Sequence, residues 1–393
     1  MAWPGRKSCW DEILGRIRFA NQLRGIAALL VAMSHLIGVY WALPDVVSSV
    51  TATPPQLGPL PGIFWFTSFR WFNLGPFGVA IFFLISGMVV PFSLEHHGRG
   101  GFLLARVLRI YPTYAAALAT EIGIVLLSSR VWDRPVPFTP ALVAGNLSLL
   151  YDLMGQSSID LVNWTLSVEL KFYLLVALLA PIIRRGSAFW VVLAGGALCA
   201  TNFLLMHAVA GSASASPSTP AYTFSSQSLC IIYMFIGTLF NFHLRGKVGT
   251  AGLVAGIAAL ALQFVASWAV GVWRAQFPPV TATYLYAFLL FSTLYSVRSY
   301  VPANRPLEAL AAISFPFYVL HSLLGYTFLR TAMVGFGLPY YSSLTISTAS
   351  VILLSTLFHL TIEKPTQRLG RQLGSSFALN WTMTRVSGEK DAP

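Results

Sequence analysis

Charged residues are scarce in this sequence. Asp, Glu, Lys and Arg together make up 10% of the 393 residues, whereas a soluble domain averages roughly a quarter. Hydrophobic residues make up 56%, and the mean hydropathy is +0.68. This shortage of charge excludes an ordinary soluble domain and predicts a membrane protein with most of its chain inside the bilayer.

The sequence also lacks the motifs of several enzyme classes. The three cysteines, Cys9, Cys199 and Cys230, have no regular spacing, so no disulfide framework is expected. The loop pair His96 and His97 has no further ligand nearby, and we expect no metal site. The absence of H-E-x-x-H, C-x-x-C, G-x-S-x-G and Walker-type motifs argues against metalloproteases, dithiol oxidoreductases, α/β-hydrolases and nucleotide hydrolases.

Apolar segments of membrane-spanning length recur along the chain. We predict an all-α, polytopic membrane helix bundle of about ten transmembrane helices with both termini in the cytoplasm. Most Lys and Arg residues then fall in inside segments, which accounts for the net charge of +12 without nucleic-acid binding. The predicted spans are 21–41, 74–92, 106–127, 163–183, 188–208, 226–242, 248–270, 280–297, 308–329 and 340–361.

The predicted spans divide the chain into three parts. Residues 1–20 are expected to form a cytoplasmic tail or an interfacial helix, residues 21–362 the transmembrane domain, and residues 363–393 a cytoplasmic tail. Two long loops, 44–73 and 130–162, are predicted on the outside, and we find no internal repeat. The activity is therefore expected to reside in the membrane part.

The first span, NQLRGIAALLVAMSHLIGVY, carries two ionisable residues. Arg24 and His35 are eleven residues apart, about three helical turns and about 16 Å, so their side chains fall on nearly the same face. Arg24 is expected near one membrane surface and His35 well inside. This stripe indicates a cavity that takes an anionic ligand at its mouth and carries out proton chemistry at depth.

Further ionisable residues lie in or beside other spans. Arg106 and Arg109 share a helix face at the same surface as Arg24 and could clasp phosphates, although a plain positive-inside anchor is the simpler interpretation of the pair alone. Glu169 and His321 lie deep in predicted spans, and each could also be a hydrogen-bonded link between helices.

Six motifs together resemble the acyltransferase-3 family of bacterial membrane O-acyltransferases, over almost the whole chain and in order. They are Asn21 to His35, GPFGVAIFFLISGMVV from Gly75, Arg106-Val-Leu-Arg109-Ile-Tyr-Pro, Asn163 to Tyr173 with Thr165 for the usual Ser, Ser314 to His321, and Ile362-Glu363-Lys364-Pro365. The resemblance implies transfer of an acyl group, commonly acetyl from acetyl-CoA, to a hydroxyl of a saccharide or cell-surface glycan. It also implies a multi-pass protein of the bacterial cytoplasmic membrane.

The residues suggest roles within such a reaction. Arg24, Arg106 and Arg109 are predicted to bind the phosphates of acetyl-CoA or another acyl-CoA. His35 is the predicted general base for the acceptor hydroxyl. Glu169 is predicted to orient His35 or to stabilise its imidazolium, with His321 on the acceptor side. Direct transfer is favoured, because no activated Ser or Cys nucleophile is evident.

Three alternatives remain open at this stage. The acceptor could be a secreted small molecule such as a macrolide. A secondary transporter could use the buried His and Glu as a proton relay, although the missing repeat and the cations at one mouth argue against it. The chain could also be a structural partner in polysaccharide export, in which case His35 and the arginines would tolerate substitution. The predicted partners are acyl-CoA, a sugar or glycan acceptor that could be lipid-linked, and membrane lipid.

Overall fold

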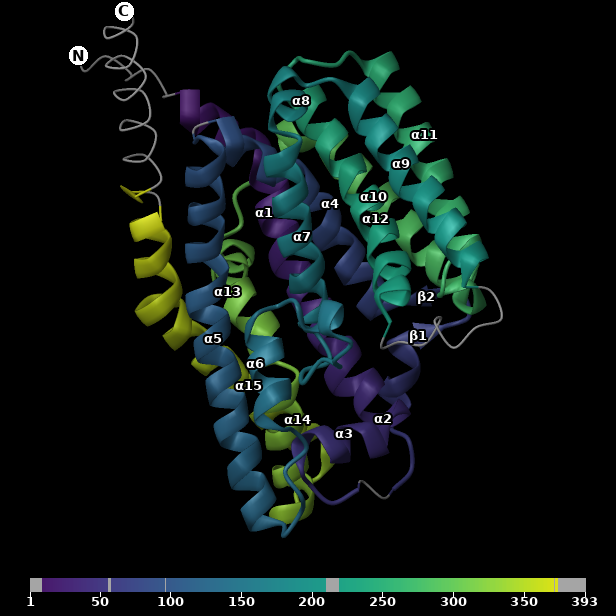
Figure 1. Ribbon diagram of the computed structural model, residues 1–393. Helices are drawn as coiled ribbons and strands as arrows, with labels where there is room; N and C mark the ends of the chain where they lie inside the picture. The colour runs from purple at the N-terminus through teal and green to yellow at the C-terminus, as the bar shows by residue number, and fades with distance from the viewer. Residues whose placement is uncertain (1–8, 56–57, 96, 210–218, 371, 374–393) are drawn as a thin grey trace, which may run out of the picture.

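The computed structural model describes residues 9–55, 58–95, 97–209, 219–370 and 372–373. This part of the chain is almost entirely helical, and its helices run as a bundle with one short β-hairpin at its side (Figure 1). The predicted all-α membrane bundle is confirmed. Residues 1–8 and 374–393, which belong to the two predicted tails, lie outside the described residues.

The elements follow one another with short connections. The α-helices are α1 (Cys9–Met33), α2 (Tyr40–Ala42), α3 (Pro44–Thr51), α4 (Leu74–Glu95), α5 (Arg99–Val131), α6 (Pro140–Leu147), α7 (Trp164–Leu178), α8 (Ala180–Arg185), α9 (Ala188–Ala208), α10 (Pro220–Leu244), α11 (Thr250–Val270), α12 (Pro279–Ser296), α13 (Arg305–Leu320), α14 (Leu323–Arg330) and α15 (Tyr340–Phe358). Three π-helical turns are η1 (Ser34–Val39), η7 (Thr331–Gly335) and η8 (His359–Glu363), and four 3₁₀ turns are η2 (Gly62–Phe66), η3 (Tyr151–Met154), η5 (Arg274–Gln276) and η6 (Arg298–Tyr300). Strands β1 (Ser68–Phe69) and β2 (Phe72–Asn73) pair antiparallel, with Ser68 opposite Asn73.

Every predicted span coincides with helix, but the number of crossings is less clear. In the described residues seven helices are long and apolar enough to cross a membrane, and α13 with α14 makes an eighth if this pair, bent by 74°, is one span. The other two predicted spans correspond to α7 with α8 and to α12. The count of ten and the cytoplasmic termini therefore stay predictions.

Small residues let α1 pack closely in the middle of the bundle. On one side, a Cβ atom at Gly25 would lie 2.8 Å from the backbone nitrogen of Ala311 in α13. On the other side, Gly78 of α4 is equally close to the carbonyl oxygen of Ala27. Helices in a membrane associate through such close contacts, because lipid provides no hydrophobic force between them. The packing fixes the helix that carries Arg24 and His35.

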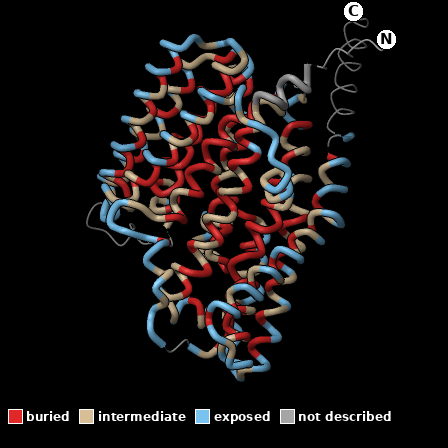
Figure 2. Tube along the Cα trace, turned by 180° about the vertical axis from the view of Figure 1, so that it is seen from behind, coloured by how far each residue is buried: buried red, intermediate tan, exposed pale blue. Residues whose placement is uncertain are grey.

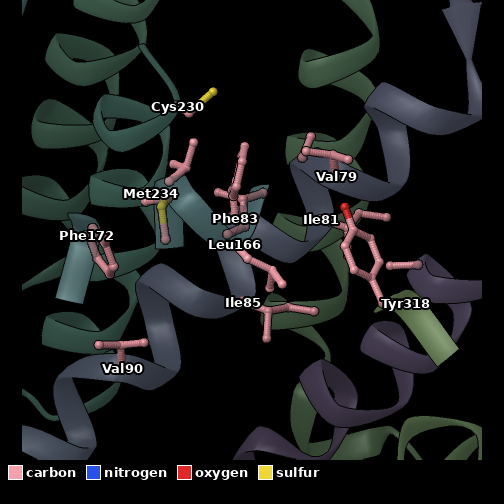
Figure 3. Close-up of a cluster of buried hydrophobic side chains, with 14 of the residues drawn as sticks. Val79, Ile81, Phe83, Ile85, Val90, Leu166, Phe172, Cys230, Met234 and Tyr318 are labelled. Atoms are coloured by element: carbon pink, nitrogen blue, oxygen red, sulfur yellow. The ribbon is translucent and has the colours of Figure 1, made fainter. Parts of the chain in front are cut away.

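Buried side chains fill the centre of the bundle along its length (Figure 2). Figure 3 shows part of this core, where Phe83 of α4, Leu166 of α7, Met234 of α10 and Tyr318 of α13 converge. Helix α10 is the most completely enclosed of the apolar helices, with 94% of its apolar window buried. It packs on α4, α9 and α11.

The closest backbone contact in this core joins α4 and α10. A Cβ atom at Gly87 would overlap the carbonyl oxygen of Met234, and one at Gly237 would overlap that of Leu84. The side chains of Thr238 and Asn241 donate to the carbonyl oxygens of Gly87 and Met88, at 3.2 and 2.8 Å. The two backbones are therefore held together by contact and by hydrogen bonds.

We expect Gly87→Ala to destabilise the protein by at least about 1–3 kcal/mol, because the methyl group meets backbone that cannot turn away. The loss is measured as a lower Tm in detergent. Gly123→Ala is the matched control, since Gly123 lies inside α5 with open space around its Cβ position. Equal Tm values for the two variants would contradict the close crossing.

Candidate active site

The three arginines predicted to bind phosphates line one cavity. Arg24 comes from α1, and Arg106 and Arg109 come from α5. Glu169 of α7 and Ser86 of α4 line the same cavity, which has a volume of about 70 Å³. The spacing in the sequence placed each arginine at one membrane surface, and the fold brings all three to the same internal space.

Aromatic rings hold Arg106. Its guanidinium carbon lies 5.6 Å from the ring centre of Phe102 and 5.3 Å from that of Tyr173, and only 7% of the residue is exposed. Stacking on two rings restricts the side chain, so that a guanidinium group faces the cavity with little remaining freedom.

Arg24 and Arg109 are less restrained. Both are half-buried, and within the described residues neither side chain has a hydrogen bond or an ion pair. The nearby carboxylates are Glu169 and Glu363, and Glu363 is bound to His359 at 2.7 Å. Three guanidinium groups thus face two carboxylates, one of which already has a partner. The excess of positive charge suits a polyanionic ligand.

Glu169 belongs to this arginine cavity. Its Oε1 accepts hydrogen bonds from Ser86 at 3.2 Å and from Tyr173 at 2.5 Å. Tyr173 also stacks on Arg106, so the carboxylate helps to position the arginine through that ring. No contact between Glu169 and His35 is found in the described part of the chain, and the predicted role beside His35 stays a prediction.

His35 lies on a π-helical turn. The turn η1 interrupts the first span at Ser34 and shifts the direction of the following side chains, a feature that is frequent at functional sites. The Nδ1 atom of His35 is 2.8 Å from the hydroxyl of Tyr326 in α14. Its ring meets the ring of His321 edge-on, with centroids 5.1 Å apart. The histidine therefore faces the protein interior.

His321 ends α13, immediately before the 74° bend to α14. Its Nδ1 lies 2.8 Å from the carbonyl oxygen of Tyr318 and 3.2 Å from that of Phe317. Since a carbonyl oxygen only accepts, Nδ1 carries the proton, and Nε2 of the neutral ring has a free lone pair. Nε2 is buried and has no hydrogen-bond partner within the described residues. It can accept a hydrogen bond from a hydroxyl group brought beside it.

Tyr318 connects the two groups of residues. Its side chain lines the arginine cavity, where its hydroxyl lies 2.7 Å from that of Thr165. Its ring centre is 5.7 Å from that of His321. The histidine pair thus lies directly behind one wall of the arginine cavity.

Two residues near the histidines were missed by the sequence analysis. Tyr326 follows His321 by five residues and reaches His35 only because the chain bends between α13 and α14. Asp160 is 2% exposed and lies close to Tyr326 and Ser322, although it belongs to a loop predicted to be outside. A motif search offers no signal for either residue, since both positions depend on tertiary structure.

A polar network explains why that loop folds inward. The amide nitrogen of Asn163 donates to the side-chain oxygen of Asn146 at 3.1 Å and to the hydroxyl of Tyr114 at 3.2 Å. The backbone nitrogen of Ile159 donates to the same oxygen of Asn146 at 3.0 Å. These bonds fix residues 159–163 against α5 and carry Asp160 into the bundle.

Other ionisable residues of the spans serve the packing. Lys171 donates to both oxygens of Asp152, at 2.8 and 3.0 Å, and is thereby neutralised beside α7. Glu121 is buried in α5, and its Oε1 has no partner within the described residues. Neither residue lines the arginine cavity.

The fold and this site define a multi-pass membrane protein with a basic internal cavity next to a histidine pair. The comparison with known families agrees with the motifs. Residues 17–360 match the acyltransferase domain, and the chain belongs to the acyltransferase-3 family of membrane O-acyltransferases. The predicted family and enzyme class are confirmed.

A relative of known name supports this assignment. The chain is 31% identical over 131 residues to nodulation protein 10 of Rhizobium leguminosarum bv. viciae. The match covers 28% of this chain and 34% of the relative, so it spans about a third of that protein's length. No solved structure gives a significant match to the chain.

Proposed function

We propose that the protein transfers an acyl group, acetyl in the first instance, from acyl-CoA to a hydroxyl group of a saccharide. The observation that supports this proposal best is the convergence of Arg24, Arg106 and Arg109 on one cavity behind the His35–His321 pair. Coenzyme A carries phosphates at one end and the reacting thioester at the other. A cavity with cations at one end and an imidazole behind it fits that order.

The donor enters from the arginine side. The guanidinium groups bind the phosphates through charge-assisted hydrogen bonds, which are roughly twice as strong as neutral ones. Arg106 is already oriented by Phe102 and Tyr173, so little conformational freedom is lost when a phosphate binds it. The narrow cavity then admits the pantetheine arm toward Tyr318 and the histidines.

His35 acts as the general base. With Nδ1 held by Tyr326, Nε2 is the atom free to receive the proton of the acceptor hydroxyl. The hydroxyl oxygen attacks the thioester carbonyl carbon, the carbon–sulfur bond breaks, and the imidazolium returns the proton to the departing CoA thiolate. The free Nε2 of His321 accepts a hydrogen bond on the acceptor side. The contacts of Glu169 support a positioning role in the donor cavity.

The acceptor and the location follow from the family resemblance. We propose a glycan or lipid-linked sugar as acceptor, and the bacterial cytoplasmic membrane as the site, with the arginine cavity facing the cytoplasm where acyl-CoA is available. A secreted small molecule remains the second acceptor class to be compared in the same assay.

The experiment uses the purified full-length protein in nanodiscs with radiolabelled acetyl-CoA and a panel of saccharide acceptors. We expect release of CoA thiol together with transfer of the label to an acceptor. A proton-coupled transporter would instead move a solute across a vesicle membrane without any thioester cleavage, and that result would contradict the proposal.

Tyr326 offers a separate test of the histidine geometry. We expect Tyr326→Phe to lower kcat about fivefold to tenfold, because a hydrogen bond that holds His35 is worth about 1 kcal/mol. Tyr340→Phe is the matched control, since its hydroxyl bonds the carbonyl oxygen of Leu36 and not His35. Initial rates of transfer at saturating acyl-CoA measure the difference, and equal rates for the two variants would remove Tyr326 from the reaction.

A further inference from the structure

We propose that a groove between α5, α14 and α15 binds a lipid with a long alkyl or isoprenoid chain and a phosphate-linked head. The inference rests on the proposed acyl transfer and deepens it, because it names the acceptor class: a saccharide carried on a lipid phosphate. Nothing in the arginine cavity contributes to this groove, whose lining residues are different.

The groove has walls from three helices. Leu127 and Val131 come from α5, Phe328 from α14, and Ile346 and Ser350 from α15. Its surface is almost entirely apolar, and its volume is about 410 Å³. A methylene group is about as large as a water molecule, which occupies about 30 Å³, so the groove holds on the order of a dozen methylene groups.

The groove opens toward the surroundings of the bundle. Leu127 is 57% exposed and Val131 is 64% exposed, and both belong to α5, which is long and apolar enough to cross a membrane. Helix α15 also belongs to an apolar span with most of its surface uncovered. In a bilayer this opening faces hydrocarbon, so an alkyl chain can enter from the side without crossing water.

Charge and an aromatic ring mark one end of the groove. Trp132 lines it, and tryptophan is enriched at the level of the lipid headgroups. Arg130 and Arg134 flank Trp132 along the chain, and both are exposed with no side-chain hydrogen bond or ion pair in the described part of the structure. Asp133 lies between them, which leaves one net positive charge at this rim. An apolar groove with a basic end complements a phosphate head joined to a hydrocarbon chain.

The groove lies behind the helix that supports His35. Helix α14 presents Tyr326 to His35 and the next two residues, Thr327 and Phe328, to the groove. An α-helix with its side chains is about 10 Å wide, so the two sites are about one helix diameter apart. A sugar joined to a lipid phosphate spans such a distance, which places its hydroxyl groups within reach of the histidine pair.

The probe for this site is a polyisoprenyl phosphate with a diazirine group in its chain, applied to the full-length protein in phosphatidylcholine nanodiscs. After illumination, labelled peptides are identified by mass spectrometry. We expect labelling in 124–132 and 327–338, and competition by unlabelled polyisoprenyl phosphate but not by added phosphatidylglycerol. Equal competition by phosphatidylglycerol would identify an ordinary annular lipid and overturn the proposal.

Two pairs of variants sharpen the result. Ser350→Trp fills the groove and should reduce labelling at least fivefold, whereas Leu353→Trp on the same helix, 71% exposed and outside the groove, should leave it unchanged. The double change Arg130→Gln and Arg134→Gln should weaken labelling, whereas Arg70→Gln in another exposed segment should not. Unchanged labelling in the filled and neutralised variants would contradict the site.

Failure of this inference can be distinguished from failure of the proposed function. Labelling depends on binding alone and proceeds without acyl-CoA. If labelling fails while acetyl transfer to a soluble saccharide persists, the lipid site is wrong and the enzyme activity stands. If labelling succeeds and no acyl-CoA is consumed with any acceptor, the lipid site stands and the acyl transfer is wrong.

Discussion

Replacement of His35 by alanine is expected to lower kcat for acyl transfer by about 100-fold to 10,000-fold, the usual contribution of a general base. The imidazole is the group that takes the proton of the acceptor hydroxyl, and alanine leaves no base at Nε2. Binding of acyl-CoA should remain largely intact, because the three arginines lie on the cavity in front of the histidine pair. The measurement is the single-turnover rate of label transfer from acetyl-CoA.

A matched histidine controls for this change. His207→Ala removes an exposed histidine near the end of α9, far along the chain from the site, and should retain the wild-type rate. Size-exclusion profiles and Tm values of both variants establish that the fold persists. If His35→Ala keeps near wild-type turnover, the imidazole is not the base, and the proposed mechanism is wrong.

The second large effect is expected at the donor cavity. Changing both Arg106 and Arg109 to glutamine should raise the Kd for acyl-CoA at least 100-fold, since each charged hydrogen bond contributes about 1.5–3 kcal/mol. Transfer at saturating donor should be less affected, because neither arginine contacts His35. Isothermal titration with a non-reactive acyl-CoA analogue gives the affinity.

Two further measurements show whether the effect comes from phosphate contacts. Arg99→Gln changes an exposed arginine at the start of the same helix, outside the cavity, and should leave the Kd unchanged. Dephospho-CoA should bind the wild-type protein more weakly than CoA, while the double variant should discriminate less between the two. A double variant that keeps the full preference for CoA would exclude these arginines as the phosphate site.

The helices of this fold could be predicted from the sequence because hydropathy is a local property. Each predicted span coincides with helix, and small errors at the ends reflect turns that continue the helix, as at Ser34 and His359. The number of crossings could not be settled in the same way. Helix α7 has 15 residues, and α13 and α14 are bent by 74°, so the length and composition of a segment do not determine its path.

The donor side was easier to predict than the histidine side. Arg106 and Arg109 lie three residues apart on one helix, and Arg24 starts its span at the same surface, so helical geometry brings them together. The contacts of Glu169 with Ser86 and Tyr173 depend on the arrangement of α4 and α7, which no spacing reveals. Tyr326 and Asp160 likewise reach the histidines through a bend and an inward loop.

The most direct test of the central claim is a structure of the full-length protein bound to an acetyl-CoA analogue in which a methylene group prevents transfer. We predict that its phosphates contact Arg24, Arg106 and Arg109 and that its carbonyl group lies beside the rings of His35 and His321. An analogue bound elsewhere, with the arginine cavity empty or with Tyr318 sealing it from the histidines, would contradict this account.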